Sequence, residues 1–519
     1  MRRARFRHSF VFFVFLYLRH GHYLDAGSCY HAAVMDIRLL PYEKSSKNLG
    51  LELFLSEPEE YLATIIDTKS QLILTKDFSD AVEQALTHTF IPVRGKAKIL
   101  KSLRLSKLLV IFFAITIGVL AFLPINNYFR GDTNDYAKWF RVGEAVLEGG
   151  DIYAPRGDGT FQFMYPPTAA VLFAIPSYFG ELPLIIFLVI LYSLAWIASL
   201  LLSVFLVTGT VWRNDPLLYF VPGVCCLPYV VENYLLGQPN LLLLALMLAA
   251  FVCLRSGKAW SAGALVALAS AIKAFPVLAI VYFVYRRHWK ATLSTLVFLV
   301  LFLVLVPSLF RGFERNLHDL GTWTKGMLHY DPTAVSQRQQ RGYSWSNHSL
   351  VAVAHRLLRP VNAHRKRDQT LRVNIADIDF KYVTIVIILA GLGLCLFYIL
   401  CMPRHSERTN LSDALEQAML LLLILIFTPL AFTYFFVWLL YPMVVVLHLV
   451  LTAPPRSPER IRGWVWFWAS IALIAFTLPV TAFRPLQAAG STLLACLLLF
   501  LGIGWKLRVA TRSRRFSRA

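Results

Sequence analysis

The stretch LPLIIFLVILYSLAWIASLLLSVFLVTG, residues 182–209, contains no charged side chain. A helix that spans a bilayer needs about 20 consecutive apolar residues, and two other runs reach that length, KLLVIFFAITIGVLAFLPIN (107–126) and ATLSTLVFLVLFLVLVPSLF (291–310). The chain is 57% hydrophobic and 16% charged, whereas ordinary globular domains carry about a quarter charged residues. These runs predict an all-α polytopic membrane protein.

The formal net charge of the 519-residue chain is +21, which in a soluble protein would indicate a nucleic-acid partner. In a membrane protein the Lys and Arg residues of cytoplasmic loops explain such a charge, so we expect no nucleic acid. The seven cysteines fall mostly inside apolar runs and form no CxxC pair. Neither a disulfide framework nor a zinc site is therefore expected.

Basic segments between the apolar runs set the expected topology. RGKAKILKSLRLSK (94–107) carries no acidic residue and is expected in the cytoplasm, so the first helix leads outward. The outer loops are then residues 126–165 and 311–380. The second loop is itself basic, but long loops are translocated largely regardless of charge. With both termini inside, we expect about twelve transmembrane or half-membrane helices.

The sequence divides into three parts. Residues 1–106 form an N-terminal cytoplasmic or peripheral extension, residues 107–508 the transmembrane domain, and residues 509–519 a basic cytoplasmic tail. The first residues, MRRARFRHSFVFFVFLYLRH, faintly resemble a signal peptide but lack a clear cleavage site. An over-extended start site is the alternative to a genuine extension.

A charged residue interrupts the apolar segment AWSAGALVALASAIKAFPVLAIVYFVY (259–285) at Lys273, three residues before Pro276. Both ends of this segment are basic, which predicts a pair of short helices that turn near Lys273. A lysine within an apolar segment costs about 2.5 kcal/mol or more. A lipid phosphate or Glu232 would compensate for that cost, and snorkelling to the interface is the alternative.

The first outer loop begins with GDTNDYAKWFRVGEAVLEGG (131–150). Its apolar residues fit one face of a helix, and Gly149-Gly150 is typical of a helix end, so we expect an interfacial helix. Asp132 and Asp135 stand at its start. Acidic residues there are typical of a helix cap, and a carboxylate at the membrane surface is equally suited to general-base chemistry.

Four motifs in order resemble glycosyltransferase family 87 over about residues 107–450. The first outer loop has D-x-x-x-Y, G-x-x-x-Y ending at Tyr153, and F-x-Y-P-P (163–167). G-Q-x-N follows at 237–240. A-G-x-x-x-x-x-A-x-x-x-K-x-x-P (262–276) comes next, and S-N-H-S-L (346–350) stands where the family has N-x-S-L.

The resemblance implies roles for particular residues. Asp132, four residues before Tyr136, matches the family's general base, and Asp135 is its rival. The residues that would bind substrate are Tyr136, Tyr165, Gln238, Asn240, Lys273, Asn347, His348 and Tyr434. For the Gln, Asn and Ser residues among these motifs, capping of a neighbouring helix is the alternative interpretation.

The late outer turn, TPLAFTYFFVWLLYP (428–442), departs from the family pattern. Relatives have S-P-x-S-W followed by paired histidines, and here Phe432 replaces the Trp while Tyr434-Phe435 stand where the histidines would fall. Tyr434 or an arginine of the second outer loop would then bind the donor phosphate.

The resemblance implies a GT-C type helical bundle, a plasma (inner) membrane location and an active site at the outer face. The implied activity is a metal-independent hexosyltransferase without a cofactor, which moves a sugar, mannose foremost, from a polyprenyl-phosphate donor to a lipid or glycan acceptor. A transporter or flippase of a lipid-linked solute is the alternative and would show broken helices in both halves. An inactive scaffold of the same fold is a third interpretation.

Overall fold

The structure is a computed structural model that describes residues 35–36, 54–55, 93–154, 163–211, 215–339, 341–364, 369–478 and 480–516. Contacts within the chain divide it into two units, Met1–Leu100 and Lys101–Ala519. In the first unit β1 (Met35–Asp36) and β2 (Phe54–Leu55) pair antiparallel. The stretch that resembles a signal peptide lies outside the described residues.

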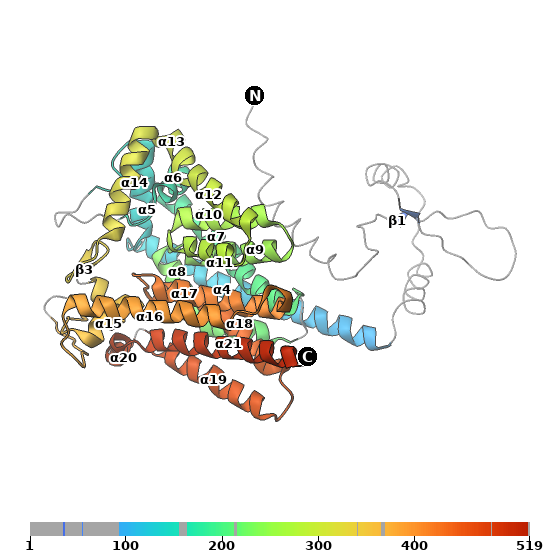
Figure 1. Cartoon of the computed structure of the whole chain (residues 1–519). Helices are drawn as coiled ribbons and strands as arrows, with labels where there is room; N and C mark the ends of the chain where they lie inside the picture. The colour runs from blue at the N-terminus through green and yellow to red at the C-terminus, as the bar shows by residue number, and fades with distance from the viewer. Residues whose placement is uncertain are drawn as a thin grey trace, which may run out of the picture. The chain divides into compact units, whose positions relative to one another are not determined.

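The second unit is built almost entirely from helices (Figure 1). Its first half comprises α4 (Val93–Phe129), α5 (Tyr136–Leu147), α6 (Pro167–Ser177), α7 (Glu181–Thr208), α8 (Leu217–Leu236), α9 (Asn240–Arg255), α10 (Ala259–Ile272), η2 (Phe275–Leu278), α11 (Ala279–Tyr285) and α12 (Trp289–Val300). Its second half comprises η3 (Leu301–Leu305), α13 (Val306–Arg311), α14 (Phe313–Leu328), η4 (Arg341–Tyr343), α15 (Leu350–Leu358), α16 (Phe380–Cys401), η5 (His405–Glu407), α17 (Asn410–Phe427), η6 (Thr433–Leu439), α18 (Leu440–Thr452), α19 (Pro458–Ala475), η7 (Thr481–Phe483), α20 (Arg484–Ala489) and α21 (Ser491–Phe516).

Seven helices of the described residues are long and apolar enough to cross a membrane. They are Leu105–Phe129, Glu181–Thr208, Trp289–Arg311, Phe380–Cys401, Asn410–Phe427, Thr433–Thr452 and Ser491–Thr511. Four shorter apolar helices accompany them: Pro167–Ser177, Asn240–Arg255, Ala259–Ile272 and Phe275–Tyr285. The all-α membrane class is thus confirmed, while the count of about twelve helices stays a prediction.

The burial of the helices separates a central group from a peripheral group. The apolar windows of α17 and of η6 with α18 are 78% buried, whereas that of α16 is 11% buried. Leu389, Leu392 and Leu396 of α16 are exposed, as are Leu293 and Leu296 of α12. Exposed apolar patches of this extent are typical of a surface that contacts other apolar material. These faces are therefore suited to lipid.

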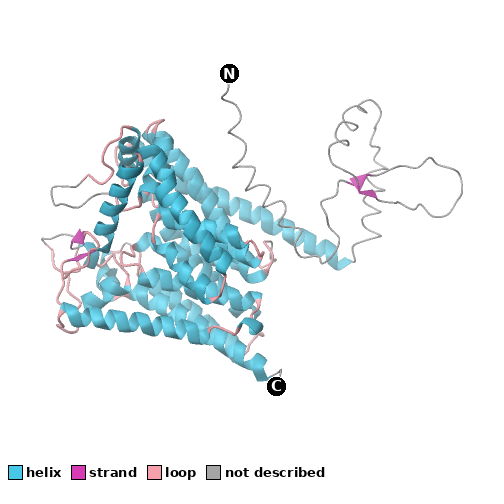
Figure 2. Ribbon diagram, turned by 45° about the horizontal axis from the view of Figure 1, so that its top comes forward, coloured by secondary structure: helices cyan, strands magenta, loops and turns pink. Residues whose placement is uncertain are grey.

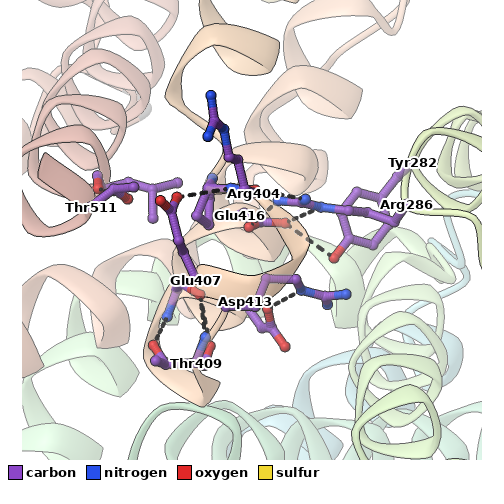
Figure 3. A network of polar contacts seen from close by, with 12 residues as sticks. Tyr282, Arg286, Arg404, Glu407, Thr409, Asp413, Glu416 and Thr511 are labelled. Atoms are coloured by element: carbon purple, nitrogen blue, oxygen red, sulfur yellow. Dashed lines mark hydrogen bonds and ion pairs between the residues drawn. The ribbon is translucent and has the colours of Figure 1, made fainter. Parts of the chain in front are cut away.

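A buried ion pair joins α11 to α17 (Figure 3). The Nε atom of Arg286 donates to Oε2 of Glu416 at 2.8 Å, and Nη1 of Arg286 donates to the carbonyl of Pro403 at 3.0 Å. The hydroxyl of Tyr282 contacts the same carboxylate. Both charged side chains are almost wholly buried. Their contacts with each other replace the contacts with water that burial removes.

The few non-helical elements of the second unit gather at one end of the helical bundle. The antiparallel strands β3 (Ala334–Val335) and β4 (Arg338–Gln339) follow α14, and Figure 1 shows β3 at the same end as α14 and α15. Figure 2 shows this short strand pair among loops beside the helices. β4 and α14 contribute Arg338 and Trp323 to the lining of the cavity described next.

Candidate functional site

A cavity of about 1300 Å³ is enclosed by segments that lie far apart in the sequence. Its charged lining residues are Asp135, Lys138, Glu232, Lys273, Arg338 and Arg341. Its apolar lining includes Val231, Leu235, Leu236, Val277, Leu278, Met327, Phe427 and Leu430. A cavity with a long apolar wall and a few convergent polar groups is typical of a small-molecule site. Here it fits a ligand with a polar head and an apolar tail.

The expected helix of the first outer loop is present as α5, and its location at a membrane interface stays a prediction. One face of α5 is buried, and Trp139 on that face donates from Nε1 to the carbonyl of Gly237 at 2.9 Å. The hydroxyl of Tyr136 donates to the carbonyl of Tyr234 at 2.6 Å. Because both rings are engaged, α5 is held against the end of α8.

Gly237 ends α8 with φ +63, the left-handed conformation that favours glycine. A Cβ atom at this position would lie 3.0 Å from the indole nitrogen of Trp139 and 3.1 Å from the ring of Tyr136. A larger residue would therefore push α5 away from α8. The glycine of the G-Q-x-N motif is explained by this close approach.

Asp135 faces the cavity beside three polar side chains. It forms an ion pair with Lys138, and its Oδ2 accepts a hydrogen bond from Nε2 of Gln238 at 2.7 Å. Oε1 of Gln238 in turn accepts from the hydroxyl of Tyr165 at 2.6 Å. Burial raises the pKa of Tyr165 well above its ordinary value, so the phenol stays protonated and donates. The carboxylate is thereby fixed in one orientation.

Asp132 takes a different place from Asp135. Its side chain is exposed, and it is not among the residues that line the cavity. Its backbone N–H donates to the carbonyl of Asn127 at 3.0 Å, in the turn that follows α4. Of the two aspartates, Asp135 is the one that the structure brings to the cavity.

Lys273 stands at the break that the sequence predicts. Its backbone is extended, with φ −154 and ψ 121, and ends α10. Pro276 lacks an N–H, so it cannot donate to the carbonyl of Ile272 as a continued helix would require. The chain instead enters the short helix η2.

Aromatic rings surround the ammonium of Lys273. Nζ lies 3.8 Å from the ring centroid of Phe435, 5.2 Å from that of Tyr165 and 5.3 Å from that of Tyr434. Contacts of this kind stabilise a cation that has lost water. Nζ also donates to Oδ1 of Asn240 at 3.1 Å. The ammonium is thus held at the cavity wall by Asn240 and three rings.

Asn240 contributes to the site from behind the lining. Its Nδ2 donates to Oδ1 of Asn233 at 3.1 Å, and Nδ2 of Asn233 donates to the carbonyl of Tyr434 at 2.9 Å. These bonds connect Lys273 to the late outer turn through two buried amides. Asn240 therefore positions Lys273 and does not itself face the cavity.

The S-N-H-S motif lies behind the lining except for Ser346, which lines the cavity. Oδ1 of Asn347 accepts from the backbone of Ala431 at 3.0 Å, and its Nδ2 donates to the carbonyl of Pro429 at 2.9 Å. The buried ring of His348 packs edge-on against Phe436, with centroids 5.5 Å apart. Ser349 caps α15 by accepting from Ala352. This motif connects the loop of residues 311–380 to the turn at 428–436.

The expected site residues therefore divide into two groups. Lys273, Tyr165, Gln238 and Tyr434 line the cavity. Asp132, Tyr136, Asn240, Asn347 and His348 do not. Residues that the sequence analysis did not single out also line it: Lys138, Trp139, Trp323, Arg338 and Arg341. The amphipathic pattern of α14 is the signal that would have found Trp323.

No group of three or more His, Cys, Asp or Glu side chains that could hold a metal ion occurs in the part of the chain that the structure describes. The charged residues of the cavity wall are four basic and two acidic. Three of the basic ones, Lys273, Arg338 and Arg341, would suit an anionic headgroup.

The fold and the cavity define a polytopic helical membrane protein with a site for an amphiphilic ligand. The model of glycosyltransferase family 87 matches residues 163–429, and the chain belongs to this family. It is accordingly a membrane glycosyltransferase. Comparison with curated proteins gives no match, and comparison with solved structures gives none either. The matched range includes Tyr165, Gln238 and Lys273 but not the first-loop aspartates or Tyr434.

Proposed function

We propose that the protein transfers a sugar, a hexose with mannose foremost, from a polyprenyl-phosphate donor to a lipid or glycan acceptor. The reaction would take place at the outer face of the plasma (inner) membrane. The proposal rests on one arrangement, a carboxylate and an ammonium on either side of Tyr165. The hydroxyl of Tyr165 reaches Asp135 through Gln238, and its ring contacts the ammonium of Lys273.

Asp135 is the general base in this proposal. The family motif spacing favours Asp132, whereas the cavity lining favours Asp135. A carboxylate offers about four lone-pair sites, and the hydrogen bonds from Lys138 and Gln238 occupy two of those of Asp135. The remaining sites are free to accept the proton of an acceptor hydroxyl. Asp132 is the rival in the experiment below.

Lys273 stabilises the leaving group. As the acceptor oxygen bonds to the anomeric carbon, the bond from that carbon to the phosphate oxygen breaks and its electron pair stays on the lipid phosphate. The acceptor proton passes to the Asp135 carboxylate. A fixed positive charge stabilises the second negative charge that develops on the phosphate. Because the donor is a lipid monophosphate, the reaction as written uses no metal ion.

The apolar wall accommodates the lipid. Val277 and Leu278 of η2, Phe427 at the end of α17, and Leu430 line the cavity with apolar side chains. A polyprenyl chain would bury apolar surface there, which is favourable by about 25 cal/mol per Å². Asp135 and Lys273 both line this cavity, so a lipid headgroup bound there would contact both side chains.

The test is transfer by the purified protein, with a panel of polyprenyl-phosphate sugars and a lipid acceptor. Asp135→Asn is expected to lower the rate by about 10²- to 10⁴-fold, with an unchanged melting temperature. Asp132→Asn serves as the comparison and is expected to retain most of the rate. Loss in Asp132→Asn alone would return the base to Asp132. Movement of intact donor across liposomes, with no new glycosidic bond, would support a flippase instead.

A further inference from the structure

One face of α8 carries an acidic residue into the cavity wall. Pro228, Val231, Glu232, Leu235 and Leu236 line the cavity, and their spacing places them on a single helical face. The intervening positions Tyr229, Val230, Asn233 and Tyr234 are buried in the bundle. Glu232 is therefore the one charged group on an otherwise apolar face of this helix.

Glu232 places an acidic side chain on the cavity wall. Charged residues within membrane helices are costly and face cavities or partners. Glu232 is half-buried and lines the cavity. It precedes Leu236, the last residue of α8, by four residues, which is about 6 Å along a helix. The carboxylate thus lies roughly one helical turn from the end that leads into Gln238.

The chemistry of a carboxylate limits what binds against it. A phosphate is repelled by its like charge, and an aliphatic chain would remove its water without replacing the hydrogen bonds. Hydroxyl groups suit it, because an ionised carboxylate only accepts hydrogen bonds. The cations of the wall that suit a phosphate stand on other segments, Lys273 after α10 and Arg338 on β4.

We infer that Glu232 is a specificity-determining residue that accepts hydrogen bonds from sugar hydroxyl groups. The inference rests on the proposed function, since it assigns a sugar-binding role to a residue that lines that same cavity. The hydroxyl groups belong either to the sugar of the donor or to a glycan acceptor. Asp135 then accepts the proton of the acceptor hydroxyl, and Glu232 binds sugar hydroxyl groups without taking part in the proton transfer.

Binding and transfer are measured for Glu232→Leu and for Glu232→Gln, which keeps the shape and one acceptor oxygen. Glu148→Gln is the matched control, because Glu148 is exposed at the end of α5 and does not line the cavity. Trp139 and Trp323 line the cavity, so tryptophan fluorescence reports binding even where no transfer occurs. The three probes are polyprenyl-phosphate mannose, polyprenyl phosphate without a sugar, and a mannoside acceptor.

We expect Glu232→Leu to raise the Kd of one mannose-bearing probe about tenfold or more and Glu232→Gln to raise it less. The Kd of sugar-free polyprenyl phosphate should stay unchanged. Weaker donor binding assigns Glu232 to the donor sugar, and weaker acceptor binding assigns it to the acceptor. The inference would be overturned if both variants kept the wild-type Kd for every probe. It would also be overturned if binding weakened equally with and without the sugar. Wild-type binding without any transfer would instead count against the proposed function alone.

Discussion

Gln238 donates a hydrogen bond from Nε2 to Oδ2 of Asp135 at 2.7 Å, across 103 residues of sequence. The glutamine side chain is buried, and its other end accepts from Tyr165. The amide therefore has only one orientation that satisfies both neighbours. Through this amide, Tyr165, which lies near the start of the range that the family model matches, holds the carboxylate of Asp135, which precedes that range.

Replacing Gln238 by Leu should lower the rate of transfer about 10- to 100-fold, because Asp135 loses the bond that orients it. The KM for the donor should change little, since in the proposed function Gln238 orients the general base. Steady-state kinetics with a lipid acceptor separate the two parameters. Gln238→Glu is a useful companion, because it keeps the length but adds a negative charge beside Asp135. A variant in which only the KM rises would show that Gln238 contacts the donor directly.

Asn240 should act through Lys273, whose Nζ donates to its Oδ1 at 3.1 Å. Asn240→Leu removes that acceptor and should raise the KM for the donor about tenfold. Asn240→Asp keeps an acceptor oxygen and should restore most of the donor binding. Donor titrations at fixed acceptor concentration measure both effects. Equal KM values for the leucine variant and the wild type would contradict a positioning role.

The sequence predicted the parts of the site that follow from local chemistry. The break at Lys273 could be read from a charge and a proline inside an apolar run, and the end of α5 from Gly149-Gly150. Gln238 and Tyr165 followed from their motifs. In each case the deciding interaction lies within a few residues, or the motif itself specifies it.

Which of the two aspartates lines the cavity depends on tertiary contacts and could not be predicted from spacing. Asp135 reaches the cavity because α5 packs on α8 through Trp139, which no local pattern indicates. Asn347 and His348 look like ligands in sequence, and in the structure they hold two loops together. Whether a polar residue faces a cavity or braces it depends on partners about 80 to 100 residues away.

Asn316 should stabilise the wall that α14 contributes to the cavity. Its Nδ2 donates to the carbonyls of Leu303 and Val304 at 3.0 and 3.1 Å, within the π-helical segment η3. A π segment leaves carbonyls without their usual helical partners. Asn316→Leu should therefore cost about 1–3 kcal/mol of stability, seen as a lower melting temperature in detergent. Lys325→Ala, on the same helix but exposed, should leave the melting temperature unchanged.

Removing only one partner of the ion pair between Arg286 and Glu416 should destabilise the protein strongly. Both side chains are almost wholly buried, so Glu416→Leu leaves an uncompensated buried guanidinium at a cost of about 3–5 kcal/mol. The double variant Arg286→Met with Glu416→Leu should recover much of that loss. Thermal unfolding of Glu416→Leu, Arg286→Met and the double variant measures the coupling. Additive losses in the double variant would show that the two charges do not stabilise each other.

His355 should make the second outer loop sensitive to acid. Burial, with a smaller effect of Arg359, lowers the pKa of His355 from 6.5 to about 3, and its Nε2 forms a hydrogen bond of 2.6 Å with the hydroxyl of Tyr330. The unfolded chain binds a proton below about pH 6.5, whereas the folded protein resists protonation until about pH 3. Stability is therefore complete above pH 6.5 and falls as the pH drops toward 3.

The melting temperature of the wild type should accordingly fall more between pH 7 and pH 5 than that of His355→Gln, in which the side-chain amide can still form a hydrogen bond with Tyr330 but does not titrate. His318→Gln is the matched control, because His318 is exposed on α14 and should keep the wild-type dependence. Burial raises the pKa of the neighbouring Tyr330 and Tyr343, so both phenols stay protonated over this range. Identical pH profiles for His355→Gln and the wild type would exclude His355 as the titrating group.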